Sequence, residues 1–559
     1  MMPVVASAQT ASQITPPSFR PNLERPGGFA LPGVAGLATP QGADKLFVRL
    51  SGVSVQGGLA ELAAASAELE RRLVGRPVSG AEVFAAARDL EAAYVQAGYI
   101  LVRVVLPPQK LINGAPLKLT VVDGFIERVE LKDVPEQLRG RIAHLLQPIV
   151  GRRGLTLRDL ERRVLLAGDT PGGILRSTIA AGQADGASVL IIEAKYQPVS
   201  AVLSVDNTLS SALGRTTLGT GVDLNSVAGF GELIYLRGSG HPADGDNGLL
   251  GRYPTNRLLA AGVVLPLWID GLTFNTEFTD ARTTPAARFG VQTTDEFQRL
   301  SLRMRYAIQR GRIANWSSEI GFDAEEETQS LLLGAIPVPL AQDRLRVVRW
   351  SNDGDVLLPW GAALSGRVTA SFGLDGLGAR SADDASPSLP LSRQGAGASF
   401  QKLDLTLGYA QSLLDHLAVN VAFRGQTSFG QALLRAEQFG IANTSGLSSF
   451  DAGSIVGDEG YVARGELSSP WSVAVPDLPN GVVAAPYLFA ARGEVFLRRP
   501  TALEPARIGA SAFGGGLRLS GFQPGALSNG TLVLEYGRAT RDDGVAASHR
   551  FTVVTAIRF

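Results

Sequence analysis

The stretch Phe551-Thr-Val-Val-Thr-Ala-Ile-Arg-Phe559 decides the fold. Its large apolar side chains recur at every second position, which places them on one face of a strand and Thr552 and Arg558 on the other. A strand of this pattern that ends on an aromatic residue is typical of the last strand of a bacterial outer-membrane β-barrel. A half-buried strand of a soluble β-sandwich would show the same alternation, so the remaining sequence has to separate the two.

Composition favours the membrane barrel. Hydrophobic residues make up 45% of the 559 residues, and the mean hydropathy is +0.12. A membrane-spanning helix needs about 20 consecutive apolar residues, whereas the longest apolar stretch, residues 258–269, is interrupted by Gly262 and Pro266. A hydrophobic chain without such stretches is expected when lipid-facing residues are spread singly over many strands.

Charge and reactive residues argue against several classes of function. The chain has no cysteine, which excludes disulfides and thiolate metal sites, and its formal net charge is +0, which gives no field to attract nucleic acid. The four histidines are scattered, at His144, His241, His416 and His549. We therefore expect no enzyme active site, no metal site and no cofactor.

Residues 1–43 differ from the rest of the chain. Ala6-Ser7-Ala8 before Gln9 resembles a signal-peptide cleavage site that lacks the positive region and most of the apolar segment, and a plain flexible terminus is an equal alternative. Prolines at positions 16, 17, 21, 26, 32 and 40 exclude a long helix. We expect a signal remnant followed by an extended or disordered Pro/Gly-rich linker.

Two segments with the same expected order of elements follow. Residues 44–122 show a strand at 46–55, helices at 59–73 and 80–96, and strands at 99–106 and 117–122, with Val78-Ser79 as the cap of the second helix. Residues 123–197 show a strand at 125–131, helices at 135–146 and 157–166, and strands near 174–180 and 188–193. This β-α-α-β-β repeat predicts two small α/β domains in tandem.

Residues 198–559 lose the helical period and alternate between apolar and polar side chains. The alternation recurs at residues 272–280, 300–306, 316–323, 403–409, 417–424 and 532–536. Arg299, Arg303 and Arg305 on one expected strand face Glu319 and Asp323 on the next, an arrangement that suits ion pairs inside a lumen.

The connections between these strands alternate in length. Residues 309–315 and 412–416 form short connections, whereas residues 238–253 and 375–398 form long polar ones. Short turns on one rim and long loops on the other are typical of outer-membrane barrels. At roughly 22 residues per strand and connection, we predict an α+β amino-terminal part followed by a transmembrane antiparallel β-barrel of about sixteen strands.

Three sets of segments resemble the two-partner secretion transporters (TpsB), the ShlB/FhaC/HecB family of the outer-membrane protein 85 superfamily. The first set is Tyr94-Val-Gln-Ala-Gly-Tyr-Ile-Leu-Val-Arg-Val-Val-Leu-Pro-Pro-Gln109, Asn113-Gly114 and Val121-Val-Asp-Gly-Phe-Ile126. The others are Leu155-Thr-Leu-Arg-Asp-Leu-Glu161 with Gly186-Ala-Ser-Val-Leu190, and Val205-Asp-Asn-Thr208 with Gly214-Arg-Thr-Thr217. The resemblance covers about residues 46–559 and identifies the two small domains as POTRA domains.

The resemblance implies a pore in the bacterial outer membrane with its POTRA domains in the periplasm. Such a pore captures a secreted TpsA-like exoprotein in extended form and translocates it unfolded, as in haemolysin or adhesin secretion. Outer-membrane lipid and the barrel assembly machinery are the other implied partners. The implied exoprotein-binding residues are Tyr94, Gly98, Tyr99, Arg103, Pro108, Gln109 and Gly124, and the implied assembly signal is Phe551, Val553, Ile557 and Phe559.

The sequence departs from the family in loop six, which in relatives folds back into the barrel and carries a Val-Arg-Gly-Phe/Tyr tetrad. Alignment on Ala436-Glu-Gln-Phe439 and Gly457-Asp-Glu-Gly-Tyr461 gives Leu447, Ser448, Ser449 and Phe450 at these positions, so the arginine is absent. The aspartate that receives this arginine belongs to a Phe-x-Asp segment, which matches Phe489-Ala-Ala491, so the acid is absent as well.

Loss of both groups is easier to accommodate than loss of one. A single missing partner would leave a buried charge uncompensated at about 3–5 kcal/mol, whereas removal of both costs little. Arg492, next to Ala491, is a candidate for a replacement anchor, and Arg464-Gly465 falls on the strand after the loop.

A second departure concerns the barrel plug. Many relatives close the barrel with an amino-terminal helix, but the prolines leave no room for one beyond Pro16. We expect a short or absent plug, and little change in conductance when residues 1–43 are deleted. Two other functions remain open: an outer-membrane protein assembly or insertion factor, and a non-secreting barrel that anchors a surface structure.

Overall fold

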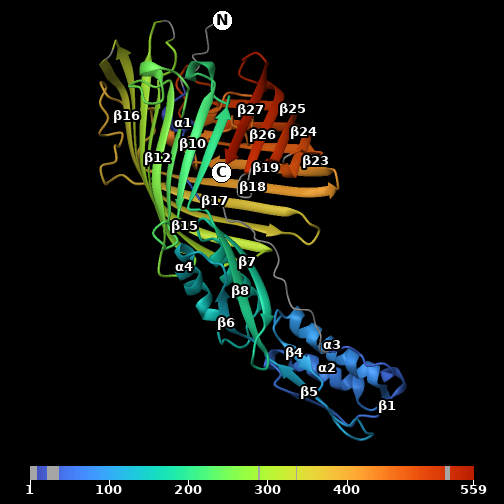
Figure 1. The fold of residues 1–559 in the computed structure, drawn as a ribbon. Helices are drawn as coiled ribbons and strands as arrows, with labels where there is room; N and C mark the ends of the chain where they lie inside the picture. The colour runs from blue at the N-terminus through green and yellow to red at the C-terminus, as the bar shows by residue number, and fades with distance from the viewer. Residues whose placement is uncertain (1–8, 22–36, 288–289, 335, 477, 523–528) are drawn as a thin grey trace.

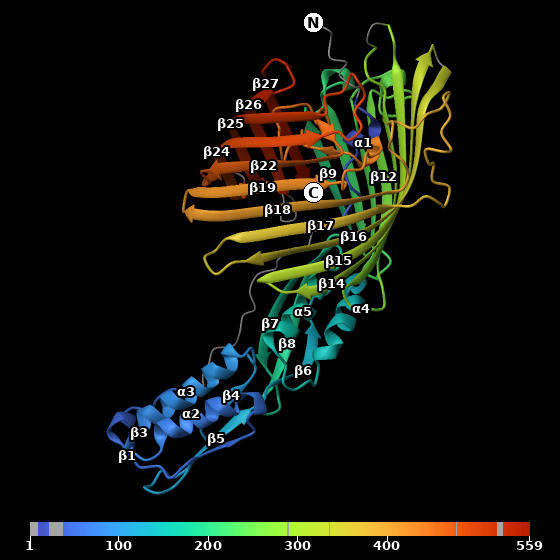
Figure 2. The ribbon, with the colours of Figure 1, turned by 180° about the vertical axis from the view of Figure 1, so that it is seen from behind.

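The computed structural model describes residues 9–21, 37–287, 290–334, 336–476, 478–522 and 529–559. The signal-like Ala6-Ser7-Ala8 lies outside the described residues. Two small α/β domains follow one another below a β-barrel, and the short helix α1 (Ala11–Ile14) lies within the barrel (Figures 1 and 2). None of the described helices is long and apolar enough to cross a membrane.

The first α/β domain contains the expected helix pair on a small sheet. Its elements are η1 (Ala43–Lys45), β1 (Phe47–Val48), β2 (Val53–Gln56), η2 (Ala60–Leu62), α2 (Ala63–Leu73), β3 (Val78–Ser79), α3 (Gly80–Gln96), β4 (Arg103–Val105) and β5 (Leu117–Val122). The sheet order is β2-β5-β4, and β1 pairs separately with β3. The start of α3 is fixed by a capping box, in which Ser79 Oγ accepts a hydrogen bond from the Glu82 N–H and the Glu82 carboxylate accepts one from the Ser79 N–H. This backbone hydrogen bond lowers the pKa of Glu82.

The expectation of one continuous strand over residues 46–55 is wrong. The chain forms β1 and β2, because the backbone between them bonds to the connection before β5. Arg49 donates its N–H to Asn113 Oδ1 at 2.9 Å, and Ser51 donates its N–H to Ala115 O at 3.2 Å. The segment thus leaves β3 and joins β5 in parallel pairing.

The second α/β domain repeats this order. Its elements are β6 (Phe125–Leu131), α4 (Glu136–Leu146), η3 (Gln147–Ile149), α5 (Leu157–Gly168), β7 (Gly173–Ala181) and β8 (Ala187–Tyr196), with sheet order β6-β8-β7. Helices α4 and α5 bury Leu138, Ile142 and Leu160 against the sheet. The two domains thus share a parallel pairing of an early strand with the last strand and a helix pair, and the first domain has the β1–β3 pair in addition.

The rest of the chain closes into an antiparallel barrel. Its strands are β9 (Val199–Asp206), β10 (Thr217–Asn225), β11 (Leu233–Gly240), β12 (Asn256–Pro266), β13 (Leu272–Thr283), β14 (Thr293–Arg310), β15 (Ala314–Leu333), β16 (Ile336–Leu357), β17 (Ala363–Gly373), β18 (Phe400–Leu414), β19 (Leu417–Thr427), β22 (Glu459–Ser468), β23 (Trp471–Val475), β24 (Leu478–Phe496), β25 (Arg507–Phe522), β26 (Asn529–Arg541) and β27 (Ser548–Arg558). Because β22 and β23 both pair with β24, one after the other, they form a single interrupted strand. Over the residues that the structure describes, the barrel therefore has sixteen strands, and β27 closes it onto β9.

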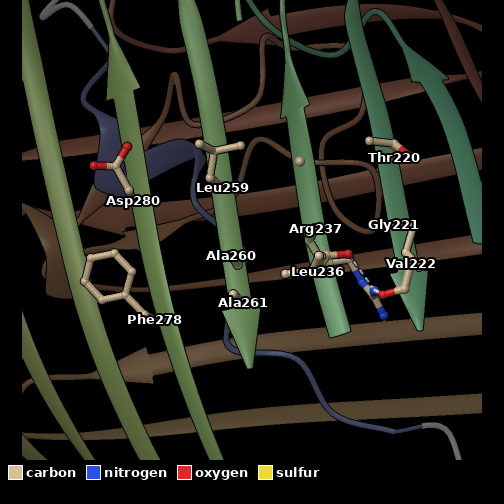
Figure 3. Close-up of a pocket in the computed structure, with 11 residues that line it drawn as sticks. Thr220, Gly221, Val222, Leu236, Arg237, Leu259, Ala260, Ala261, Phe278 and Asp280 are labelled. Atoms are coloured by element: carbon tan, nitrogen blue, oxygen red, sulfur yellow. Dashed lines mark hydrogen bonds between the residues drawn. The ribbon is translucent and has the colours of Figure 1, made fainter. Parts of the chain in front are cut away.

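Side chains alternate between the outer wall and the lumen, as the sequence pattern indicated. On β11 the exposed Leu236 points outward, whereas Arg237 turns inward and pairs with Asp223 at 2.6 Å. Leu236, Ala261 and Phe278 line a pocket of about 510 Å³ on the outer side of the wall, and Figure 3 shows these side chains on their strands. A wall that exposes leucine and phenylalanine outward, around a polar interior, is suited to a lipid surround.

The connections have the expected difference in length. Residues 311–313 and 415–416 form tight turns at the end nearer the α/β domains, whereas residues 241–255 and 374–399 form long loops at the opposite end. Loop six is the connection between β19 and β22, residues 428–458. It contains η6 (Arg435–Glu437) and the short hairpin of β20 (Phe439–Gly440) with β21 (Val456–Gly457).

Candidate functional site

Loop six folds into the barrel interior, and its tip lies against the barrel wall. Leu447, Ser448 and Ser449 are all buried. Leu447 belongs to an apolar cluster that includes Phe489 and Ala491 of β24. The structure thus brings together the two segments that the sequence alignment paired.

The polar contact at this tip is reversed relative to the family pattern. The cation is Arg464 of β22, on the barrel wall, and its guanidinium donates to Ser448 Oγ at 2.6 Å and to Glu535 Oε2 of β26 at 2.6 Å. Ser448 in turn donates its hydroxyl to Glu535 Oε1. The loop therefore supplies a neutral hydroxyl, whereas the wall supplies both charges.

Aromatic and small residues complete the seat of the loop tip. The Arg464 guanidinium lies over the Phe489 ring, 4.1 Å from its centroid, and Tyr487 donates its hydroxyl to Glu535 Oε2 at 2.8 Å. Gly537 leaves the space that Ser449 occupies, because a Cβ there would lie 2.2 Å from Ser449 Oγ. A side chain at position 537 would force the side chains of Ser449 and Phe489 to move.

Arg492 does not anchor the loop, so this hypothesis is wrong. Its side chain is 69% exposed and lies 3.8 Å from Glu494. The alternation of β24 accounts for this placement, because Phe489 and Ala491 face the lumen and the next residue faces outward. Arg464 and Glu535 lie 71 positions apart, so no local pattern in the sequence indicates their pairing.

A second anchor holds the base of loop six. Glu437 of η6 is buried and pairs with Arg349 of β16 at 2.6 Å and with Lys402 of β18 at 2.9 Å. Arg349 also pairs with Asp323 and Glu325 of β15. The loop is thus tied to the wall at its base and at its tip.

Three long loops meet at one buried acid at the end of loop six. Asp458 pairs with Arg393 of residues 374–399, and it accepts the N–H of Leu433 at 3.0 Å and of Arg498 at 2.6 Å. Arg498 lies in residues 497–506, the connection that follows β24. This acid joins loop six to the loops on both sides of it.

The amino-terminal segment, residues 9–21, also lies in the lumen. The N–H groups of Ala11 and Ser12, at the start of α1, donate to Asp295 Oδ1 at 2.9 Å and to Glu327 Oε1 at 3.1 Å. Gln9 donates its side-chain amide to Ala452 O of loop six. The two elements in the lumen therefore contact each other.

This placement corrects the expectation for the plug. The helix is short, as the prolines require, because α1 has four residues. However, the extended residues after α1 also occupy the lumen, and Ser18 is buried there. Residues 9–21 are therefore not an external linker, and these lumenal contacts favour a change in conductance on their deletion, contrary to the expectation from the sequence.

The ion pairs expected across β14 and β15 are present in the lumen. Arg303 lies 2.9 Å from Asp323 and 3.8 Å from Glu319, and Arg305 lies 3.8 Å from Glu319. Arg299 instead lies 3.5 Å from Glu277 on the other neighbouring strand, β13. Fixed charges of both signs thus line this wall.

The residues implied in exoprotein binding mostly contact other parts of the first domain. Tyr94 is fully buried, and its hydroxyl accepts the Leu59 N–H at 3.2 Å. Tyr99 donates to Glu61 at 2.6 Å, and this bond raises the pKa of Tyr99. Gln109 bonds to both backbone groups of Lys118, at 2.9 Å and 2.7 Å.

The other residues implied in exoprotein binding lie where the two α/β domains meet or on the surface. Gly98 O accepts the Leu157 N–H at 2.8 Å, and a Cβ on Gly124 would lie 2.1 Å from Leu101 O. Arg103 donates to the carbonyls of Ile100 and Val102, and Pro108 is exposed. Because Ile100 and Leu101 belong to the core of the second domain, this motif couples the two domains.

The second domain docks on the barrel through charged groups of α5 and the residue after it. Asp169 accepts two hydrogen bonds from the buried Arg310 of β14, at 2.9 Å and 2.7 Å. Arg163 pairs with Asp270 in the turn between β12 and β13. These contacts set the second domain at the barrel mouth.

A cavity of about 870 Å³ connects this mouth with the lumen. Its lining runs from Gly168 and Ile174 of the second domain to Ser200, Glu277 and Arg299 of the inner wall. Phe19 and Arg20 of the amino-terminal segment lie along it. The cavity, lined by both polar and apolar residues, extends from the second α/β domain to the pore interior.

The residues of the implied assembly signal are on β27 or directly after it. Phe551, Ile557 and Phe559 are exposed on the outer wall, Val553 is partly exposed, and Thr552 is buried inside. The backbone of Phe559 exchanges hydrogen bonds with Ala201 of β9, at 2.9 Å and 3.2 Å. The alternation expected for this strand is confirmed.

Comparison with known proteins identifies the family. The profile of "Haemolysin secretion/activation protein ShlB/FhaC/HecB" matches residues 186–519, more than half of the chain, and that of the ShlB-type POTRA domain matches residues 48–124. The heme/hemopexin transporter protein HuxB of Haemophilus influenzae is 26% identical over 172 residues, which is 30% of each chain. The outer membrane transporter CdiB-2 of Burkholderia pseudomallei is 28% identical over 148 residues, 26% of this chain and 25% of that one. The chain thus matches less than a third of the length of these curated relatives.

Solved structures share the whole architecture. CdiB from Escherichia coli has a TM-score of 0.69 at 18% identity and covers 99% of this chain and 94% of its own. CdiB from Acinetobacter baumannii has a TM-score of 0.60 at 18% identity, with 98% and 95% covered. At this identity the likeness shows the fold, namely POTRA domains followed by an outer-membrane barrel. With the family profile, it shows that the chain belongs to the haemolysin secretion/activation protein ShlB/FhaC/HecB family, whose barrel lies in the outer membrane and whose POTRA domains lie in the periplasm.

Proposed function

We propose that this protein recognises an extended exoprotein through its POTRA domains and translocates it unfolded through the barrel. The observation that carries the proposal is the cavity that runs from the second POTRA domain to the inner wall. It gives a chain held in the periplasm a direct path to the lumen. Folding outside the cell would help to make export one-way, in the absence of any nucleotide-binding motif in the sequence.

The contents of the lumen support a pore that opens. Loop six is a long connection, and residues 9–21 are joined to the wall by separate hydrogen bonds and ion pairs rather than by strand pairing. Such contacts can be exchanged one at a time for contacts with a passing chain. The barrel wall itself is closed all round by paired strands and can remain intact.

The POTRA sheets offer edges for the first contact with the partner. Strands β2 and β4 are the outer strands of the first sheet, and β6 and β7 those of the second. An extended partner can add to such an edge through main-chain hydrogen bonds. Arg103 of β4 and the exposed Pro108 are the motif residues that lie near this edge, and we assign their role to partner binding.

Export of the neighbouring candidate exoprotein tests the proposal. The protein is expressed with the exoprotein encoded beside it, as the intact chain and as a variant without residues 44–197, and folding of each barrel is checked by its resistance to unfolding in detergent. The exoprotein should reach the medium with the intact chain and stay in the periplasm with the variant. Equal amounts in the medium in both cases would contradict the proposal.

A further inference from the structure

An extended segment of the chain already lies bound to the inner barrel wall. Residues 16–21, Pro-Pro-Ser-Phe-Arg-Pro, follow α1 without regular secondary structure. Phe19 donates its N–H to Glu277 Oε2 at 2.8 Å and accepts a hydrogen bond from Asn275 Nδ2 at 3.1 Å. Two side chains of β13 thus satisfy both backbone groups of one residue, as a neighbouring strand would.

Further contacts hold the backbone and the side chains on either side of Phe19. Arg299 donates to Pro16 O at 3.1 Å. Ser18 Oγ lies 2.8 Å from Ser301 Oγ and accepts a hydrogen bond from Arg303 Nη2 at 2.7 Å.

The side chains of Phe19 and Arg20 each fill a specific position. The centroid of the Phe19 ring lies 4.5 Å from that of the Tyr235 ring and 4.7 Å from the Arg237 guanidinium. Tyr235 and Arg237 both belong to β11. Arg20 forms an ion pair with Glu319 of β15. An aromatic ring between a tyrosine and a guanidinium, followed by a cation on a buried acid, is a selective arrangement.

The wall keeps unused hydrogen-bonding capacity at this place. Arg299 and Arg303 are both more than nine-tenths buried, and the Nε–H of each has no partner among the described residues. Buried donors without partners are unfavourable, so these positions are suited to further carbonyl groups of a bound chain. The 870 Å³ cavity continues from Phe19 and Arg20 towards the periplasmic mouth. None of the described residues fills this part of the cavity.

We infer that the inner face of β11–β15 is a binding groove for an extended polypeptide, and that residues 16–21 are its internal occupant. The hydrogen bonds to the backbone of Pro16 and Phe19 do not depend on side chains, so the groove can bind many sequences. The Tyr235 ring and the Glu319 carboxylate favour an aromatic residue followed by a basic one. If the protein exports an exoprotein, as proposed above, the exported chain is the competing ligand and displaces residues 16–21 from the groove as it enters the barrel.

A binding experiment with a synthetic peptide tests the groove without any export. The peptide has the sequence of residues 15–21, Thr-Pro-Pro-Ser-Phe-Arg-Pro, with a fluorescent label, and binding to the detergent-solubilised protein is followed by anisotropy. A variant without residues 9–21 should bind it saturably. The intact chain should bind it about tenfold or more weakly, because its own segment competes. A peptide with alanine in place of Phe19 and Arg20 should bind the deletion variant about tenfold or more weakly than the original peptide.

Matched variants on one strand locate the site. In the deletion variant, Glu319→Gln on the lumenal side of β15 should weaken binding, whereas Glu326→Gln on its outer side should not. Equal binding of the original and the alanine peptides, or equal effects of the two glutamine variants, would overturn the inference. If the deletion variant does not fold, full-length chains carrying Phe19→Ala and Arg20→Ala should bind the peptide more tightly than the unaltered chain, and no difference would overturn the inference.

The result also separates this inference from the proposed function. Peptide binding without export of any exoprotein would support the binding groove and contradict the proposed transport function. Export without specific peptide binding would support the transport function and contradict the binding groove.

Discussion

The guanidinium of Arg464 and the carboxylate of Glu535 lie 2.6 Å apart on the inner barrel wall, and Ser448 of loop six is hydrogen-bonded to both. In the family pattern the loop brings the cation to an acid on the wall. Here both charges belong to strands, and the loop contributes a hydroxyl. The charge pair therefore stays compensated when the loop leaves its seat, which lowers the cost of moving the loop.

Removal of Arg464 should destabilise the barrel more than removal of the charge of Glu535. Arg464→Ala leaves the buried Glu535 without its cation, at about 3–5 kcal/mol of unfolding free energy. Glu535→Gln should cost less, because Arg464 keeps Glu466 at 2.8 Å. Urea unfolding in detergent micelles measures both, with the exposed Arg538→Ala on β26 as control. A double variant, Arg464→Ala with Glu535→Gln, that is less stable than both single variants would contradict this account.

Exchange of the loop and wall residues should restore the family arrangement. Ser448→Arg alone places a second guanidinium beside Arg464 in a buried site, and the loop tip should leave the wall. Ser448→Arg combined with Arg464→Ser leaves one cation for Glu535 and should recover the docked loop. Limited proteolysis within residues 428–458 measures this, with fast cleavage expected for the single variant and slow cleavage for the exchange. Equal cleavage of the two would show that charge does not decide the position of the loop.

Deletion of residues 9–21 should open the pore. The segment fills part of the lumen through contacts with β11 and with β13 to β15, so its removal should raise the mean single-channel conductance by a factor of about two or more. Arg88→Ala is the matched control, because it releases Leu37 from the first POTRA domain and leaves the lumen unchanged. Planar bilayer recordings that show equal conductance for the deletion and the unaltered chain would refute a plugging role.

The contact between Arg310 and Asp169 should hold the second POTRA domain at the barrel mouth. Asp169→Ala removes two charge-assisted hydrogen bonds, worth about 1.5–3 kcal/mol each. Spin labels on single cysteines at Arg158 and Leu364 report the distance between α5 and the barrel. The distance distribution should broaden in Asp169→Ala and stay narrow in Asp159→Ala, because Asp159 in the first turn of α5 pairs with Arg152 rather than with the barrel. A narrow distribution in both would place the restraint elsewhere.

Local signals in the sequence predicted the elements that local contacts build. Helix α3 spans Gly80–Gln96, as predicted with Ser79 as its cap, because a capping box with Glu82 and the left-handed Gly98 act within one turn of its ends. The barrel strands followed from alternation, since lipid and water act on the two faces of each strand separately. The strand at residues 46–55 was wrong because its break depends on a connection more than sixty positions away.

The anchors of the lumen could not be predicted in the same way. Ser448, Arg464 and Glu535 meet through strand register and the inward folding of loop six, neither of which appears in a local pattern. The prolines before residue 44 correctly limited helix length, but they carry no information on where an extended segment lies. Its contacts with Glu277 and Glu319 join positions more than 250 residues apart.

Crosslinking at adjacent residues of β14 tests the central claim most directly. Because the chain has no cysteine, Ser301→Cys and Leu300→Cys each introduce a single thiol, one buried in the lumen and one exposed on the outer wall. For this experiment the candidate exoprotein is engineered with a single cysteine and is fused at its carboxyl terminus to a stably folded domain, which stalls it during export. Disulfide crosslinks should form at position 301 and be absent at position 300. Exoprotein that reaches the surface without any crosslink at 301, or with equal crosslinking at 300, would contradict passage through the barrel.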